Sequence, residues 1–529
     1  MKRIFAILPA GLLCLAAGCQ DYLDVNTNPN APQSVSANLY LPPMEHWLVT
    51  APQFDGRFVG RYTQQWMLAV GVTGTPSTWD RMGYDAASDN GAEQWRHVYW
   101  SFGQNLVDMN TKSATEQRWD LLGVGQVLKA WGWLAITDLH GEIIIKQAFD
   151  PTRTTFDYDS QEYAYTVVDS LLQEAVKNLQ RTDGAVDATY LARGDKIYGG
   201  DRSKWLKFAY GLQAMRTNHF SNKSSYKPAD VIALVDKSFI GNADDALLAY
   251  PATAADGGDF NFLGTRRSNV TSFRQTQFVV NLMNGTDFGG VVDPRLSRML
   301  AIDSANTTYR GLDPTVVGFG AFTAAQQPRN FFGYAGSKSG VGLASRYIFG
   351  DVSRIPVMTY AQLQFVKAEA AYRMGDKATA LTAFRNGVSA HIDFVNSRNL
   401  DPNMTPTQIS AAEKSAFLAS AAVSATPATL TLTMIMSQKY IAQWAWGHNE
   451  LWMDMRRYHY TDLDPASGQQ VYPGFTLPTT TLFGDNGGLP VQRIRPRYNS
   501  EYVWNIPALT TIGGLETNYH TKPLWITQP

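Results

Sequence analysis

Apolar residues recur at every third or fourth position over several long stretches of the chain, which is the period of one face of an α-helix. The clearest stretch runs from Arg118 to Leu139 and ends at His140-Gly141, where glycine can close a helix in the left-handed conformation. Other such stretches start after Asp159-Ser160, run from Arg202 to about Phe220, and run from about Leu430 to Arg457. The pattern predicts a mostly α-helical protein.

Two neighbouring helices are predicted between Tyr360 and Ile392, separated by Gly375-Asp376. Small side chains on both would let the two helices approach closely, and their spacing is similar to the second half of a tetratricopeptide repeat. A chance helical hairpin is the alternative. These small residues are Ala368, Ala371, Ala380 and Gly387.

Two long segments, residues 240–355 and 461–529, are rich in Gly, Asn, Thr and Pro and show no sustained helical period. Loops of this length are uncommon in compact proteins unless they carry function. We therefore expect one domain over residues 51–529, with a helical scaffold mainly at 115–220 and 355–460. The two irregular segments would form long loops with a few short strands.

The first residues have the order of an export signal. Met1-Lys2-Arg3 precedes an apolar run that ends in Leu15-Ala16-Ala17-Gly18-Cys19. We expect residues 1–18 to be a signal peptide, Cys19 to be lipidated, and residues 19–50 to form a tether. Cys14 is a poorer candidate because it follows a bulky leucine, and a soluble export signal with a chance cysteine is the alternative.

Composition narrows the classes of function. The chain has 529 residues, a formal net charge of -1 and a pI near 6.7, so it lacks the basic field that nucleic acid demands. Its two cysteines both lie near the N-terminus, which leaves the body without disulfides or thiolate metal sites. Aromatic residues make up 12% of the chain, and there are 14 Trp.

No enzyme motif stands out. The sequence contains no His-Glu-x-x-His, Gly-x-Ser-x-Gly or phosphate-loop pattern. Conspicuous acids lie beside Lys or Arg or on scaffold motifs, so we interpret them as structural ion partners, although a glycosidase-type carboxylate pair stays open. No cofactor is expected. A structural calcium is conceivable, but the segment from Asp24 to Asn28 lacks the glycine and terminal glutamate of a calcium loop. The acids are Glu369, Glu450, Asp454 and Glu501.

A site for sugars needs flat aromatic faces with polar groups alongside. Most tryptophans of the predicted helices are assigned to the core because they lie on apolar stripes: Trp131, Trp133, Trp205, Trp444, Trp446 and Trp452. Two loop clusters remain as candidate ligand-binding residues. The first is Trp79, Arg81 and Tyr84, and the second is Asn330, Phe331, Phe332 and Tyr334. The alternative is that these aromatics pack the loops or contact a partner protein.

Short motifs along nearly the whole chain resemble the SusD-like (SusD/RagB) family of outer-membrane lipoproteins, and their order is the strongest part of the resemblance. His140, Glu142 and Asn499 depart from the residues that are usual there. The motifs are Asp21–Asn30, Thr137–Ile143, Tyr158–Glu162, Asp195–Asp201, Lys204–Ala209, Asp293–Leu296, Tyr309–Gly311, Ala368–Ala370, Gln438–Tyr440 and Arg497–Tyr502.

This resemblance implies a helical scaffold of four tetratricopeptide-like units and an irregular ligand lobe. It also implies a lipid-anchored protein on the outside of the outer membrane that passes ligand to a SusC-type TonB-dependent transporter. In the family, the ligand surface draws on an early loop and on a segment after the Asp-Pro-Arg motif, which fits both candidate clusters. Glycan-derived oligosaccharide is the expected ligand; peptide capture and a structural repeat scaffold are the alternatives.

Overall fold

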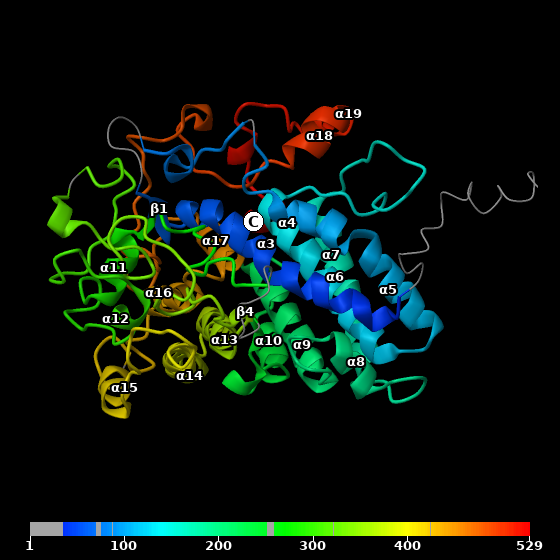
Figure 1. The fold of residues 1–529 in the computed structure, drawn as a ribbon, viewed down its shortest axis with the longest axis horizontal. Coiled ribbons are helices and arrows are strands. Elements are labelled where there is room, and N and C mark those ends of the chain that lie inside the picture. Colours follow the sequence, from blue (N-terminus) through cyan, green and yellow to red (C-terminus); the bar gives the residue numbers. More distant parts are fainter. Residues whose placement is uncertain (1–34, 70–75, 87, 251–258, 321, 424) are drawn as a thin grey trace, which may run out of the picture.

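The computed structural model describes residues 35–69, 76–86, 88–250, 259–320, 322–423 and 425–529, and helices form most of its regular structure (Figure 1). The prediction of a mostly α-helical protein with a few short strands is confirmed. The long helices are α3 (Leu41–Tyr62), α5 (Gly103–Thr115), α6 (Trp119–His140), α7 (Gln161–Gln180), α9 (Arg202–Asn218), α13 (Tyr360–Met374), α14 (Lys377–Arg398), α16 (Leu432–Gln443) and α17 (His448–Arg457).

Short helices connect and flank these elements. They are α4 (Glu93–Arg96), α8 (Ala188–Gly194), α10 (Pro228–Asp236), α11 (Gln277–Met283), α12 (Leu296–Met299), α15 (Ala411–Leu418), α18 (Tyr498–Trp504) and α19 (Ile506–Thr511). Tighter or wider helical turns are η1 (Ala37–Tyr40), η2 (Thr78–Arg81), η3 (His97–Phe102), η4 (His219–Asn222), η5 (Asn242–Asp244), η6 (Ala324–Gln326), η7 (Gly484–Asn486), η8 (Tyr519–Thr521) and η9 (Trp525–Thr527).

The N-terminal helical block has the helix ends that the sequence indicated. Helix α6 ends at Gly141, which has a φ of 85°, and α7 begins after Ser160, whose hydroxyl accepts a hydrogen bond from the Tyr163 N–H at 3.2 Å. Helices α6 and α7 pack along each other, and α9 packs against both. Their apolar faces form a buried core that includes Leu128, Val168 and Trp205.

The C-terminal block begins with the predicted helix pair, α13 and α14. Gly375 ends α13 with a φ of 88°, and Asp376 caps α14 by accepting from the Thr379 N–H at 3.0 Å. The helices approach so closely at Gly387 that an added Cβ would lie 2.9 Å from the Phe365 ring. Small residues are therefore required at this contact, as predicted, while the tetratricopeptide interpretation stays a prediction.

The prediction of one continuous helix from Leu430 to Arg457 is wrong, because the chain forms two helices there, α16 and α17. Trp444 leaves the helical conformation with a ψ of 134°, and Ala445 has a φ of 71°. The break is held by Gln65, whose carbonyl oxygen accepts from the Trp444 indole at 3.1 Å and whose side chain accepts from the Ala445 N–H at 2.9 Å. These partners lie far away in sequence, so local periodicity could not reveal them.

The predicted tether of residues 19–50 extends too far. Helix α3 runs unbroken through position 50, and several side chains between Ala37 and position 50 are buried in the core, including Leu41, Met44 and Leu48. The folded part therefore begins before residue 50. Cys19, the signal peptide and the Asp24–Asn28 segment lie outside the described residues.

The strands are short and pair locally. Strand β1 (Trp66–Leu68) pairs antiparallel with β3 (Phe273–Gln275), and β2 (Ala246–Leu248) pairs antiparallel with β4 (Ile355–Met358). The rest of residues 259–355 and 461–497 is largely irregular, as expected for the loop-rich lobe. Helices α18 and α19, which were not predicted from the sequence, lie at the top of the view in Figure 1, above α4.

Candidate functional site

Trp79, the first candidate aromatic, belongs to the core. Its side chain is 5% exposed, and its ring centroid lies 4.9 Å from that of Phe58 and 5.3 Å from that of Tyr62, both on α3. A ring that is so deeply buried between other side chains has no free face on which a sugar could stack. The interpretation of Trp79 as an exposed platform is therefore wrong for this structure, because the short turn η2 folds the indole inward against α3.

The second cluster is also mostly buried. Phe331 and Phe332 are 0% and 2% exposed, and Phe331 stacks on Phe349 at 4.7 Å. Asn330 is fully buried and organises its own loop: its amide donates to the Lys338 carbonyl at 2.9 Å, and its side-chain oxygen accepts from the Phe332 N–H at 3.1 Å. Loop packing, the alternative that the sequence left open, describes these three residues.

The other candidates are half-buried. Arg81 donates to the backbone carbonyl of Thr481 at 2.6 Å, and Tyr84 hydrogen-bonds Asp485 at 3.0 Å, so both tie their loop to the C-terminal segment. Tyr334 lies beneath the ammonium group of Lys338 at 4.5 Å. Ligand contact by Arg81, Tyr84 and Tyr334 stays a prediction. The helical tryptophans are buried as predicted, except that Trp131 is only partly so.

Two other tryptophans are strongly exposed: Trp100 at 66% and Trp504 at 73%. Trp100 forms part of the wall of a surface cleft of about 400 Å³ between α4, η3, the loop after α6 and α18. Trp504 lies on α18, one helical turn beyond two residues that line this cleft. The lining residues are Trp95, Arg96, Tyr99, Trp100, Ile144, Ala148, Phe149, Phe156, Arg497, Ser500 and Glu501.

The buried carboxylate of Asp55 caps α4, the helix at which one wall of the cleft begins. Asp55 on α3 accepts hydrogen bonds from the N–H groups of Glu93 at 2.9 Å and Gln94 at 2.8 Å, the first two residues of α4. These donors have no partner inside the helix, so Asp55 acts as a cap supplied by another element. Burial raises the pKa of Asp55 to about 7. Helix α4 then passes into η3, a π-helical turn that carries Tyr99 and Trp100.

The floor of the cleft is aromatic and rigid. The Trp95 and Tyr99 rings lie 4.9 Å apart, and the Trp95 ring also contacts His140 at the end of α6. The Tyr99 hydroxyl donates to the Ile144 carbonyl and accepts from the Ile144 N–H, both at 2.8 Å. These bonds join η3 to the loop after α6, so the two walls of the cleft hold a fixed spacing.

Charged groups lie around the aromatic floor. The Arg96 guanidinium pairs with Glu93 at 2.9 Å and lies 4.4 Å from the Trp100 ring centroid, and Arg497 pairs with Asp89 at 3.1 Å. Glu501 accepts from the Tyr158 hydroxyl at 2.5 Å and from Asn505 at 2.9 Å. Glu501 is thus hydrogen-bonded, although the sequence analysis expected an ion pair. The cleft combines aromatic surface with hydrogen-bonding groups at its edge.

This cleft was not predicted from the sequence, although part of it meets the criterion used there, which is an aromatic residue beside polar residues outside the predicted helices. Trp100 lies outside every helix that the periodicity predicted, close to the polar Arg96 and Gln104. Trp504 follows directly after the Arg497–Tyr502 motif, within the segment expected to form the ligand lobe. What could not be foreseen is that residues about 400 positions apart would line one cleft.

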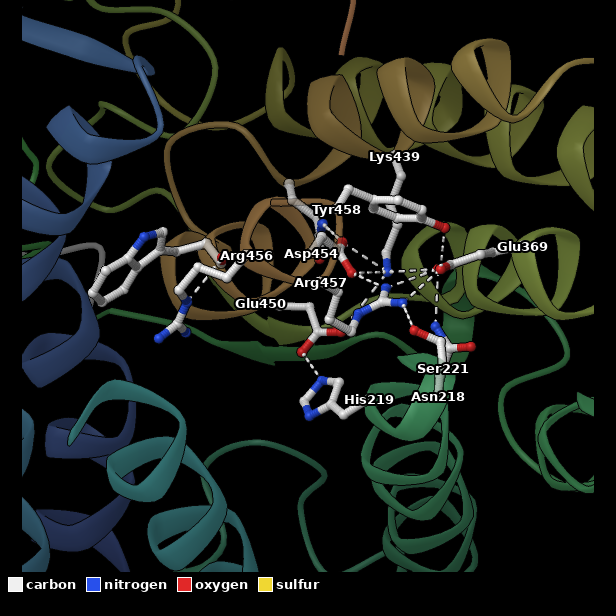
Figure 2. A network of polar contacts seen from close by, with 12 residues as sticks. Asn218, His219, Ser221, Glu369, Lys439, Glu450, Asp454, Arg456, Arg457 and Tyr458 are labelled. Carbon is white, nitrogen blue, oxygen red and sulfur yellow. Dashed lines mark hydrogen bonds and ion pairs between the residues drawn. The ribbon is translucent and has the colours of Figure 1, made fainter. Parts of the chain in front are cut away.

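A cluster of acids and bases lies in the interior and is structural (Figure 2). Lys439 contacts Asp454 at 2.8 Å and Glu369 at 3.7 Å, while Arg457 contacts the same two carboxylates at 2.5 and 2.7 Å. Glu450 pairs with His219 at 2.9 Å. The prediction that these three acids are ion partners is confirmed, and the cluster joins α13, α16, α17 and η4.

These contacts set the protonation of the cluster. Burial raises the pKa of Glu450, but His219, Lys439 and Arg457 outweigh burial and lower the pKa to about 2. Burial works against protonation of His219, but Glu450 and Asp138 outweigh it and raise the His219 pKa. Glu450 is therefore a carboxylate and His219 is held towards its protonated form. The cluster is a balanced ionic centre.

Within the described residues, no three His, Cys, Asp or Glu side chains are grouped so that they could hold a metal ion. The same part of the chain contains no helix that is both long enough and apolar enough to cross a membrane.

Comparison with known proteins identifies the family. A SusD-like family model, described as "Starch-binding associating with outer membrane", matches residues 35–478. No curated protein matches the sequence.

Solved structures share the fold. A SusD/RagB family protein from Bacteroides thetaiotaomicron is 22% identical, with a TM-score of 0.69, over 93% of this chain and 99% of that one. A chitin-binding protein is 18% identical, with a TM-score of 0.69, over 93% and 100%. A chitin-binding SusD homologue from Flavobacterium johnsoniae is 19% identical, with a TM-score of 0.63, over 93% and 98%.

The family model covers most of the chain, and the solved structures agree with it in fold. SusD-like proteins bind carbohydrate, associate with the outer membrane and are not catalytic. This chain therefore belongs to the SusD-like family, whose members bind carbohydrate and are not enzymes.

Proposed function

We propose that this protein captures glycan-derived oligosaccharides in the cleft beside Trp100 and delivers them to a SusC-type TonB-dependent transporter. It would do so as a lipoprotein anchored through Cys19 on the outer face of the outer membrane. The observation that carries the choice of site is the exposure of Trp100, at 66%, on the wall of a cleft with an aromatic floor. Trp504, which is 73% exposed, lies on α18 one helical turn beyond the lining of this cleft. Family membership supports the ligand class.

The chemistry of the cleft suits a sugar. Sugar rings present apolar C–H faces, which stack on aromatic rings, and a rim of hydroxyl groups that need donors and acceptors. Arg96 covers part of the Trp100 ring, and the remaining indole surface is open to a ligand. Arg96 and Arg497 are each paired with a carboxylate, so their charges are balanced within the protein. A neutral oligosaccharide brings no charge of its own into such a site.

Delivery to a transporter requires only modest affinity. A binding protein tethered beside its transporter raises the effective concentration of ligand at the entrance, and several sugar units can engage at once. Very tight binding would slow release. We therefore expect an oligosaccharide of several units to bind more tightly than its monosaccharide.

The experiment is a binding screen followed by paired titrations. Full-length protein lacking its lipid is screened on an array of oligosaccharides and, separately, of peptides. The best ligand is then titrated against wild type, Trp100→Ala, Trp504→Ala and the control Leu400→Ala, which removes a side chain that is 72% exposed and does not line the cleft.

We expect Trp100→Ala to weaken oligosaccharide binding by about tenfold, equivalent to about 1.4 kcal/mol, and Leu400→Ala to leave it unchanged. Melting temperatures should stay close to that of wild type for all three variants because the side chains are exposed. Peptide binding without sugar binding would favour the alternative ligand class. Sugar binding that survives Trp100→Ala and Trp504→Ala together would show that the site lies elsewhere.

A further inference from the structure

A small cavity, partly open at its surface, lies where the two helical blocks meet. It measures about 70 Å³ and lies between α3, α6, α9, β4, α13 and the start of α17, apart from the aromatic cleft. Its walls are mixed: apolar side chains such as Leu134 and Trp446 alternate with buried polar ones. The polar lining residues used below are Gln53, Gln362, His448 and Glu450.

Several polar atoms of this lining have no hydrogen-bond partner in the protein. Gln53 is 1% exposed, and neither its amide nitrogen nor its oxygen is bonded. The Oε1 atoms of Gln362 and Glu450 and the Nε2 of His448 are likewise without a partner. Buried polar groups are almost always hydrogen-bonded, because leaving one unsatisfied costs free energy. Four side chains unsatisfied around one cavity indicate that a polar guest belongs there.

The volume of the cavity and the charges around it indicate which guest it can hold. A water molecule needs about 10 to 15 Å³ of cavity measured in this way, so the space admits several waters, whereas a sugar ring is far larger. A cation would need uncompensated negative charge. Asp138, which lines the cavity, lies 3.5 Å from His219 and accepts from the Tyr165 hydroxyl at 2.5 Å. The neighbouring carboxylates, Glu369, Glu450, Asp454 and Asp138, already face four positive groups, Lys439, Arg457, His219 and Arg456.

The remaining donors and acceptors suit water. Burial lowers the pKa of His448 to about 3, so its ring is neutral and its free Nε2 either donates or accepts, according to the tautomer. Gln53 offers both kinds of group, while the free oxygens of Gln362 and Glu450 accept. A guest must therefore both donate and accept.

We propose that this cavity is a hydration site that holds several ordered waters, bridging α3, α13 and α17. The waters supply the missing partners of Gln53 and Gln362. They also solvate Glu450, whose second oxygen lies 3.8 Å from Lys439 without a hydrogen bond. The hydration site thus links the ionic cluster to α3.

The direct test is a crystal structure of the full chain at about 1.5 Å, where ordered waters are visible. We expect at least two water peaks within 3.2 Å of the Gln53 amide or the free oxygens of Gln362 and Glu450. A dry cavity would overturn the proposal. So would an anomalous peak there after soaking with thallium, which reports a monovalent cation.

A second measurement does not depend on crystals. Oxygen-17 relaxation dispersion counts long-lived internal waters in solution, and Gln53→Met, of similar volume, should lower that count by at least one. Gln104→Met is the matched control, since Gln104 is exposed on α5, and should leave the count unchanged. An unchanged count in folded Gln53→Met would contradict the proposal. If Gln53→Met fails to fold, the wild-type density decides alone.

Discussion

Individual residues show where reading the sequence succeeds and where it fails. Tryptophans on apolar helical stripes, such as Trp205 and Trp452, are buried as predicted, because periodicity reports which face of a helix meets the core. Trp79 and Phe331 lie in irregular segments, where no period reports burial, and both turn inward against residues distant in sequence. An aromatic in a loop is therefore no evidence of exposure on its own.

The burial of Trp79 leads to a first prediction. Trp79→Ala should lower the free energy of unfolding by about 3 to 5 kcal/mol, because it leaves a cavity between α3 and η2. Denaturant titration measures this directly. Trp504→Ala, which removes an exposed indole of the same size, is the control and should change stability by less than about 0.5 kcal/mol. A stable Trp79→Ala variant with weakened sugar binding would restore Trp79 as a ligand platform.

The ionic cluster leads to a prediction about pH. The folded-state pKa of Glu450 is lowered from 4.5 to about 2, so its contribution to stability is present above pH 4.5 and is lost as the pH falls towards 2. The raised pKa of His219 works in the opposite direction, since its contribution is present below its ordinary value of 6.5 and is lost as the pH rises through the folded value.

Glu450→Gln should therefore cost about 3 to 5 kcal/mol at pH 7, because it removes one of the carboxylates that offset the buried positive charges of His219 and Lys439. It should also flatten the loss of stability between pH 4.5 and 2, as measured by urea titration at each pH. Glu174→Gln, an exposed glutamate, is the control. If stability falls as steeply between pH 4.5 and 2 in Glu450→Gln as in wild type, groups other than Glu450 dominate this loss of stability.

At the scale of elements, helix ends that are set by local capping residues or helix breakers could be predicted from the sequence. Helix ends that depend on residues distant in sequence could not. Ser160 begins α7 and Gly375 ends α13 through local geometry, which depends only on residues that are close in sequence. The break at Trp444-Ala445 depends on Gln65, and α4 depends on Asp55, each supplied by another element. The cleft was missed for the same reason, since α18 meets α4 and η3 only in the folded chain.

Close packing of α3 on α17 provides a prediction at this scale. A Cβ added at Gly56 would lie 2.2 Å from the His448 ring, which is itself packed against Trp66 at 4.9 Å. Gly56→Ala should therefore destabilise the protein by about 1 to 3 kcal/mol through overpacking, although alanine is the better helix former. Gly484→Ala, whose added Cβ meets nothing within 4 Å, is the control. Equal stability of the two variants in thermal melts would contradict the packing.

The whole molecule was predictable because the family signal is spread along the chain. Motifs in the right order indicated a SusD-like protein, and the family match over residues 35–478 confirms this. The fold is shared with solved relatives that are only 16 to 22% identical in sequence. The ligand-contacting residues could not be inferred in the same way, because they depend on surface loops that the motifs do not include.

Placement of the molecule in the cell leads to a further prediction. Cys19→Ala, expressed with its own leader, should yield a folded protein that no longer sediments with membranes, because one lipidated residue would provide the anchor. Fractionation followed by immunoblotting measures this, and protease treatment of intact cells tests whether wild type faces outward. Wild type that stays protected until lysis, or Cys19→Ala that stays with membranes, would contradict the proposed anchoring.

The central claim is that oligosaccharide binds at the exposed aromatic cleft and not at the buried loop aromatics. Its most direct test is a crystal structure of the protein with the best-binding oligosaccharide from the screen. We expect a sugar ring to stack on Trp100, with hydroxyl groups within hydrogen-bond distance of Arg96, Arg497 or Ser500, and Trp79 to remain buried. A sugar bound beside Tyr84 or Tyr334, with the Trp100 cleft empty, would contradict the account.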